Sequence, residues 1–281
     1  ALKHVRSEAD PFTLSRMVKT NVLNTVKILD LLGKNKRINY FCVSTDKATN
    51  PINLMGASKL LMEKALQASM INHKISYARF ANVLFSDGSL PFGFKQRLMN
   101  DQAFSIPTNI KRYFITKYES AILCLLSALF ADNGEILFPN PHGGLRPTSF
   151  VSIAEKFLLA SGYRAKFFYD ESQAREYTPS DSFQRTEWPV HLFDSDTTGE
   201  KTIEAFYGTG DLLDLKRFNE IGVIKKYTCG SLDLDVQMFE KEFYKIDLTL
   251  DDSKQKMVDL FKAYLPEFSH DELNKNLNSR M

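Results

Sequence analysis

The sequence is poor in cysteine and contains no long apolar run. Its three cysteines, Cys42, Cys124 and Cys229, lie far apart and form no Cys-x-x-Cys motif or Cys/His cluster, so we expect no metal centre. An odd number of cysteines in mostly apolar surroundings indicates reduced thiols and a cytoplasmic protein. No apolar run approaches the roughly 18 residues that a membrane-spanning helix needs, and residues 1–6 lack the pattern of a signal peptide.

The chain also lacks an excess of charge of either sign. It has 36 lysines and arginines against 34 aspartates and glutamates, a net charge of +2. Such a balance favours neither a nucleic-acid partner nor a polybasic membrane surface. With 43% hydrophobic and 25% charged residues, the composition is that of an ordinary globular protein that can bury a sizeable core.

Helical and strand patterns alternate near the start of the chain. The order is helix, buried strand, helix, buried strand, over residues 10–33, 38–45, 54–72 and 75–83. Nearly continuous apolar runs are typical of strands that are buried on both faces, as in parallel sheets. The pattern therefore predicts an α/β fold with a doubly wound parallel sheet.

Fewer regular patterns follow residue 85. Residues 116–119 form a capping box that opens an apolar helix, and residues 135–139 predict a short strand. The polar stretch 171–201 is predicted to be irregular and to face a substrate or an interface. Within it, the single tryptophan, Trp188, is interpreted as a packing anchor.

The densest group of chemically active side chains is Ser44, Thr45, Asp46 and Lys47, at the end of a predicted buried strand. Ligands bind outside the carboxyl ends of strands in open parallel sheets. A hydroxyl, a carboxylate and an amine at that place can act as hydrogen-bond donor, acid and base. Spacing alone leaves an alternative open, in which the same side chains only cap free backbone N–H groups at the strand end.

Met55 and Lys59 are four residues apart and share one face of the next predicted helix. Taken alone, Met55 could be a core contact and Lys59 a solvated lysine. Whether Met55 and Lys59 instead belong to a functional site depends on the motifs that surround them.

The motifs resemble those of a known family. They are ALKHV at 1–5, KTN at 19–21, STDKATNP at 44–51, GASK at 56–59, RFANV at 79–83, DGS at 87–89, RYF at 112–114 and GEK at 199–201. Over residues 1–140 the chain resembles extended short-chain dehydrogenases/reductases, in particular UDP-N-acetylglucosamine 4,6-dehydratases of polysaccharide biosynthesis.

Two features depart from the usual pattern of that family. The family begins with a strand and a G-x-G-x-x-G turn that holds the cofactor's pyrophosphate, and this sequence has neither. We therefore expect either that an N-terminal portion of the natural protein is missing here or that the chain is a non-catalytic remnant. In addition, Met55 stands where the family usually has its active-site tyrosine. A sub-branch of the dehydratases is similar in having methionine there.

The resemblance implies a Rossmann-like sheet, incomplete at the N-terminus, and a smaller mixed α/β substrate domain. Residues 1–85 would form the second half of the dinucleotide-binding domain. Residues 86–281 would form mainly the nucleotide-sugar domain and the C-terminal helices, with some segments returning to the sheet. It further implies a UDP-sugar substrate, NAD or NADP as cofactor and assembly as a homo-oligomer.

The resemblance also implies a redox-neutral reaction through a 4-keto sugar. Lys47, held as a neutral amine by burial, would remove the proton on carbon 5. Asp46, held protonated in a dry site, would help to expel the hydroxyl on carbon 6. Thr45 would bind the oxygen on carbon 4. Lys59, counted with Thr45, Asp46 and Lys47 among the catalytic residues, would contact the cofactor ribose and act as a cation that sets the local electric field.

The remaining site residues follow from the same resemblance. Lys3, Asn82 and Val83 would contact the cofactor. Asn82 and Arg112 would hold the diphosphate of the substrate, the arginine through charge-assisted hydrogen bonds. Met55 would shape the sugar pocket as a packing residue.

Two other functions stay open from the sequence. A UDP-sugar 4-epimerase needs no base at carbon 5, so the Asp46–Lys47 pair argues against it. A non-catalytic nucleotide-sugar or dinucleotide sensor would explain Met55 and the absent glycine-rich turn.

Overall fold

The computed structural model describes residues 2, 3, 5, 8, 10–32, 38–67, 73–177, 186–195, 199–226 and 235–270. Cys229 and the end of the helix predicted over 54–72 lie outside these residues. In the described part of the chain, no helix is both long enough and apolar enough to cross a membrane.

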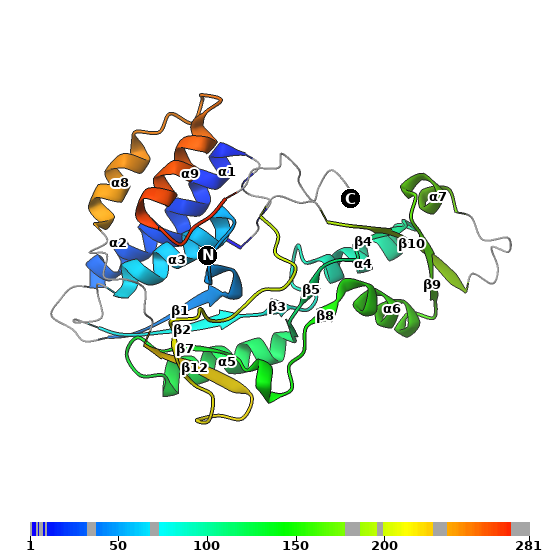
Figure 1. Ribbon diagram of the computed structural model, residues 1–281, viewed down its shortest axis with the longest axis horizontal. Helices are drawn as coiled ribbons and strands as arrows, with labels where there is room; N and C mark the ends of the chain where they lie inside the picture. The colour runs from blue at the N-terminus through cyan, green and yellow to red at the C-terminus, as the bar shows by residue number, and fades with distance from the viewer. Residues whose placement is uncertain are drawn as a thin grey trace.

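A five-stranded sheet forms the centre of the larger part of the molecule (Figure 1). Its order is β1-β2-β7-β12-β11, with bounds Asn39–Thr45, Lys74–Phe80, Ile136–Pro139, Ile221–Lys226 and Leu212–Asp214. β1, β2 and β7 are parallel, which confirms the predicted α/β Rossmann-like fold. The sheet is not parallel throughout, because β12 pairs antiparallel with both β7 and β11. The short loop between β11 and β12 permits only the antiparallel arrangement.

Helices cover both faces of this sheet (Figure 1). One face carries α1 (Pro11–Val18), a π-helical turn η2 (Lys19–Leu23), α2 (Asn24–Leu32) and α3 (Leu54–Gln67), and the other carries α5 (Lys117–Phe130). Tyr77 and Ile136 pack in the cluster that contains side chains of α3, whereas Ala78 and Leu137 pack with α5. The strands are therefore buried on both sides, as their continuous apolar runs predict.

The predicted helix starts are present. The Asp10 side chain accepts a hydrogen bond from the N–H of Thr13 at 2.7 Å and begins α1. Thr116 and Glu119 form both hydrogen bonds of the predicted capping box and begin α5. The helix predicted over residues 10–33 is interrupted by η2, and this interruption carries the KTN motif.

The C-terminal helices return to the first part of the chain. α8 (Val236–Tyr244) and α9 (Ser253–Tyr264) lie beside α1 and α3 (Figure 1). Phe239 and Phe261, both fully buried, belong to the same apolar cluster as Leu14 and Leu54. These helices thus stabilise the helical layer that carries Met55 and Lys59.

A second sheet, of three strands, forms the other part of the molecule. Its order is β4-β10-β9, all parallel, with bounds Phe104–Pro107, Glu187–Phe193 and Arg164–Phe168. The helices of this part are α4 (Leu90–Met99), α6 (Phe150–Ala160) and α7 (Glu171–Glu176). Side chains of α4 and α6 share one apolar cluster with β4 and β10.

The interpretation of residues 171–201 as irregular is wrong for much of this stretch. It contains α7 and the central strand β10, whose residues 188–192 are all buried. Trp188 is 3% exposed, which confirms its interpretation as a packing anchor. Burial between β4 and β9 overrides the polar residues and Pro189, which suggested a loop.

Short strand pairs connect the two parts. β3 (Asn82–Val83) pairs with β6 (Phe114–Ile115), and β5 (Lys111–Arg112) pairs with β8 (Thr148–Ser149). The short helices are η3 (Asp46–Ala48) and η4 (Pro141–Gly143). β3 follows β2, and η3 follows β1, so both stand just beyond the carboxyl ends of adjacent parallel strands.

Candidate active site

A cavity of about 420 Å³ opens at this edge of the larger sheet. Its lining includes seven site residues that the resemblance implied: Lys3, Thr45, Lys47, Met55, Lys59, Asn82 and Val83. Ser44 also lines it, and its far wall comes from residues 86–91, Phe114 and Phe150 of the second part. The cavity therefore lies where the two parts of the chain meet, at the place that open parallel sheets use for ligands.

Asp46 and Lys47 are in contact beside this cavity. The Nζ of Lys47 donates to the Oδ1 of Asp46 at 3.1 Å, and the same oxygen accepts from the Oγ1 of Thr45 at 2.9 Å. Asp46 is 1% exposed, and its other carboxylate oxygen has no hydrogen-bond partner in the described structure. Asp46 is therefore a buried carboxyl group whose described hydrogen bonds all go to one of its two oxygens.

Lys47 is held from a second direction by Asn82, whose Oδ1 accepts from its Nζ at 3.3 Å. The Oγ1 of Thr45 also accepts from the N–H of Lys47 at 3.4 Å, so Thr45 caps η3. The capping alternative is therefore confirmed for Thr45. Its hydroxyl also contacts the carboxylate of Asp46, and its chemical role stays a prediction.

Gly56 explains the glycine of the GASK motif. A Cβ atom at this position would lie 2.2 Å from the carbonyl oxygen of Lys47, so only glycine permits α3 to pack this closely on η3. The N–H of Gly56 donates to the Oδ1 of Asn53 at 2.8 Å. The motif thus fixes the backbone of Lys47 against the start of α3.

Lys59 is not a solvated lysine. It is 4% exposed, and its Nζ donates to the carbonyl oxygen of Val43 at 3.0 Å. Burial lowers the pKa of Lys59. Met55 is 3% exposed, packs in the core and also lines the cavity. Its thioether offers no proton to a substrate.

The KTN motif positions Lys3. Asn21, in the π-helical turn, accepts from the N–H of Leu2 at 2.8 Å and donates to its carbonyl oxygen at 2.9 Å. The same amide donates to the hydroxyl of Ser58 at 3.0 Å. Asn21 therefore links the segment that carries Lys3 to the GASK helix.

Two residues of the predicted set, Asp46 and Arg112, do not line the cavity, and Arg112 does not contact Lys47 as Asp46 does. Arg112 is 3% exposed. Its guanidinium donates to the carbonyl oxygens of Lys201 and Thr202 at 2.8 and 3.2 Å and pairs with Glu200 at 3.1 Å. Its direct contact with a diphosphate stays a prediction, and the contacts present here hold the GEK segment in place.

Glu204 is a residue of this site that was not predicted from the sequence. This carboxylate is 4% exposed, and its Oε1 lies 3.9 Å from the Nζ of Lys47. No local sequence pattern relates residue 204 to residue 47. The one available signal was the position of Glu204 shortly after the GEK motif.

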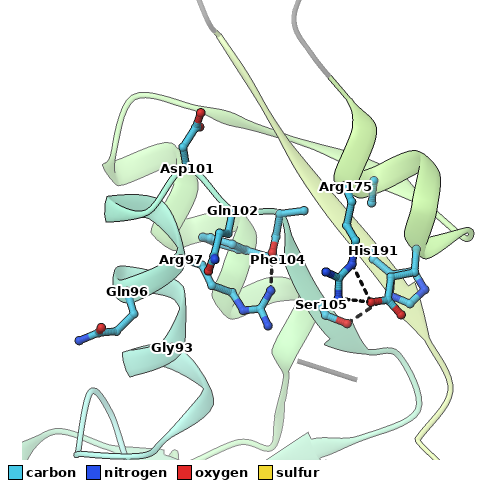
Figure 2. Close-up of a pocket in the computed structure, with 12 residues that line it drawn as sticks. Gly93, Gln96, Arg97, Asp101, Gln102, Phe104, Ser105, Arg175 and His191 are labelled. Atoms are coloured by element: carbon cyan, nitrogen blue, oxygen red, sulfur yellow. Dashed lines mark hydrogen bonds and ion pairs between the residues drawn. The ribbon is translucent and has the colours of Figure 1, made fainter. Parts of the chain in front are cut away.

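A larger cavity, about 550 Å³, lies in the second part between α4, β4, α7 and β10. Figure 2 shows Arg97 and Arg175 beside it, together with His191 and Ser105. Arg97 donates to the carbonyl oxygen of Ala103 at 2.7 Å, and Arg175 pairs with Glu171 at 2.9 Å. Because these charges are already paired or exposed, this cavity shows no comparable acid–base pair.

Among the described residues, no group of three or more His, Cys, Asp or Glu side chains could hold a metal ion.

Sequence comparisons give relatives of more than one activity. Residues 1–179 match the family described as polysaccharide biosynthesis protein. The uncharacterized membrane protein MJ1061 of Methanocaldococcus jannaschii is 34% identical, over 58% of this chain and 50% of its own length. A UDP-N-acetylglucosamine 4,6-dehydratase (inverting) of Campylobacter jejuni is 31% identical, over 50% of this chain and 43% of its own length. A UDP-glucose 4-epimerase of Rickettsia canadensis is 30% identical, over 50% of this chain and 42% of its own length. The chain spans about half the length of these relatives or less.

A solved structure shares the fold. The dTDP-glucose 4,6-dehydratase DesIV of Streptomyces venezuelae, with NAD and TYD bound, matches 87% of this chain and 71% of its own. The TM-score is 0.55 and the identity 18%, so the likeness concerns the fold alone.

Proposed function

Because this chain belongs to the polysaccharide biosynthesis protein family, we propose that its cavity serves a UDP-N-acetylglucosamine 4,6-dehydratase. The observation that carries the proposal is the hydrogen-bonded pair of Asp46 and Lys47 beside the cavity. Both the dehydratase and the 4-epimerase relatives support a nucleotide-sugar substrate. The acid–base pair favours the dehydratase, because only that reaction removes a proton from carbon 5 and a hydroxyl from carbon 6.

The residues at the cavity suit the nicotinamide end of NAD or NADP. Lys59 and Lys3 supply amines, and the buried hydroxyl of Ser44 lines the same cavity without a hydrogen-bond partner in the described structure. Lys3, Lys59, Asn82 and Val83 would hold this end of the cofactor. The chemistry that the cofactor supplies when bound is acceptance of a hydride from the sugar and its later return.

The side chains of this chain would divide the proton transfers. Thr45 would bind the hydroxyl on carbon 4 of the sugar and relay the proton that this hydroxyl loses to Asp46, whose Oδ1 lies 2.9 Å from the Thr45 hydroxyl. Lys47 would accept the proton from carbon 5, and Asp46 would donate a proton to the hydroxyl that leaves carbon 6 as water. Asn82 would orient both Lys47 and the substrate. Met55 would pack against the sugar.

The test is to incubate the protein with UDP-N-acetylglucosamine and NAD in heavy water and to record the NMR spectrum of the product. A dehydratase incorporates deuterium at carbon 5 and forms a new methyl group at carbon 6. Inversion at carbon 4 without deuterium at carbon 5 would identify an epimerase instead. Binding of the nucleotide sugar without turnover would identify a sensor.

A further inference from the structure

In the described structure, two strongly buried carboxylates lie near the amine of Lys47: Asp46 and Glu204. The Oε1 of Glu204 lies 3.9 Å from the Nζ of Lys47, and its Oε2 lies 3.6 Å from the Nζ of Lys201. Glu204 is 4% exposed, so water contributes little to stabilising its charge. The two lysines are thus its main partners.

The segment that carries Glu204 is fixed at several points. The carbonyl oxygen of Gly199 accepts from the side chain of Asn53 at 2.9 Å. Lys201 donates to the carbonyl oxygen of Thr49 at 2.7 Å, and Arg112 binds the backbone at Lys201. Asn53 and Thr49 flank the loop that follows η3, so these contacts hold Glu204 in register with Lys47.

We propose that Glu204 is the positioning residue of Lys47: its carboxylate holds the Lys47 amine in place and stabilises the ammonium ion that forms when Lys47 accepts a proton. This part of the argument rests on the proposed function. Asp46 cannot serve as the counter-ion at that moment, because it must carry a proton in order to act as an acid. Glu204 then supplies the negative charge beside Lys47.

Four charged groups around Glu204 influence whether its carboxylate stays charged. They are Asp46, Lys47, Lys201 and Arg112. Burial raises the pKa of Glu204 and the charge of Asp46 adds to this, whereas the three cations oppose the rise. Protonation of Asp46 removes the one anion in this set, so Glu204 keeps its own charge more readily when Asp46 is the acid.

The proposal can be tested without any substrate. Lys47 in the full chain is labelled with trace acetic anhydride over a range of pH, and mass spectrometry of its peptide gives the rate. Glu204→Gln keeps the shape of the side chain and removes its charge. We expect Lys47 to be labelled about tenfold faster in this variant near pH 8, because a larger fraction of the amine is neutral. Glu200→Gln is the matched control: the same segment, but a partner of Arg112.

A second variant should change the labelling rate of Lys47 in the opposite direction. Lys201→Met removes the cation that shares Glu204, so Lys47 should keep its proton more firmly and be labelled roughly threefold more slowly. Because Lys201 also repels the charge of Lys47 directly, Glu204→Asp, which withdraws the carboxylate by one methylene, is the variant that remains decisive if Glu204→Gln does not fold. Lys47 should then be labelled faster than in the wild type, and unchanged labelling would overturn the proposal. Equal labelling of Lys47 in the wild type and in every folded variant would overturn the proposal.

Kinetics then separate positioning from structure. If the chain is a dehydratase, Glu204→Gln should lower kcat for carbon-5 exchange by about tenfold at alkaline pH, where the Lys47 amine is neutral in both proteins. KM should change little, and Glu204→Asp should restore part of kcat. Unchanged kcat, or equal losses in the Gln and Asp variants, would overturn the role. Altered labelling in a chain without dehydratase activity would reject the proposed function while leaving the contact with Lys47 established.

Discussion

The charged groups of the two cavities differ in exposure. Beside the cavity at β1, Asp46 is 1% exposed and the side chain of Lys47 is 17% exposed. At the cavity beside α4, the side chain of Arg175 is 63% exposed. The second cavity is the larger of the two. Charges at its mouth are solvated, and water screens them. At the smaller cavity desolvation makes protonation depend on a few neighbours, which is what acid–base chemistry requires. Burial of opposed charges, rather than volume, distinguishes the candidate active site.

Lys47→Ala should have the largest effect, because it removes the proposed base. We expect exchange of the carbon-5 proton to fall by roughly 100- to 10,000-fold. Binding of the nicotinamide cofactor, measured by calorimetry, should persist, since Lys59 and Lys3 are untouched. Near-normal exchange would reject Lys47 as the base and remove the main chemical difference between the two cavities.

Asp46→Asn tests the acid separately. It keeps the size of the side chain but cannot donate a carboxylic proton, so formation of the carbon-6 methyl group should fall by about 100-fold or more. Proton exchange at carbon 5 should decrease less. The ratio of the two NMR signals measures this division, and equal losses of both would show that Asp46 and Lys47 act as one unit.

Gly56→Ala should mainly lower the stability of the fold. The added methyl group meets the carbonyl oxygen of Lys47, so α3 and η3 must separate. We expect a loss of about 1–3 kcal/mol in the free energy of unfolding, measured by urea denaturation. Gly93→Ala is the matched control, because a Cβ there meets no atom within 4 Å. Equal losses in the two variants would contradict the close packing at Lys47.

Met55→Leu should change little. The substitution nearly conserves volume, so a loss below about 1.5 kcal/mol in unfolding free energy and most of the activity are expected. Thr45→Val, in contrast, should slow the hydride step, because it removes the hydroxyl that contacts Asp46. An inactive Met55→Leu beside a normal Thr45→Val would reverse this division of roles.

Arg175→Ala should have the smallest effect. The ion pair with Glu171 is exposed and lies within one helix, so it contributes about 0.3–0.5 kcal/mol. Thermal unfolding should barely shift, and turnover of the nucleotide sugar should stay unchanged. A marked loss of turnover would show that the larger cavity takes part in the reaction.

Local patterns in the sequence predicted several elements well. The strand at residues 38–45 and the capping box at Thr116 depend on neighbouring residues, and both are present. The strand β10 was missed because its burial comes from β4 and β9, which are distant in sequence. Likewise, β12 is antiparallel because of the turn before it and its pairing with β7. The sequence of residues 221–226 does not indicate this direction.

The sequence by itself determined which side chains lie at the end of β1. Because the strand is buried on both faces, the residues at which it ends, Thr45 to Lys47, lie at the edge of the sheet. The tertiary structure alone decided their partners. Asn82, Glu204 and Lys59 reach this edge from a neighbouring strand, a distant segment and a helix. Charge and burial at a site depend on contacts between segments far apart in the chain, and these form only when the whole chain packs.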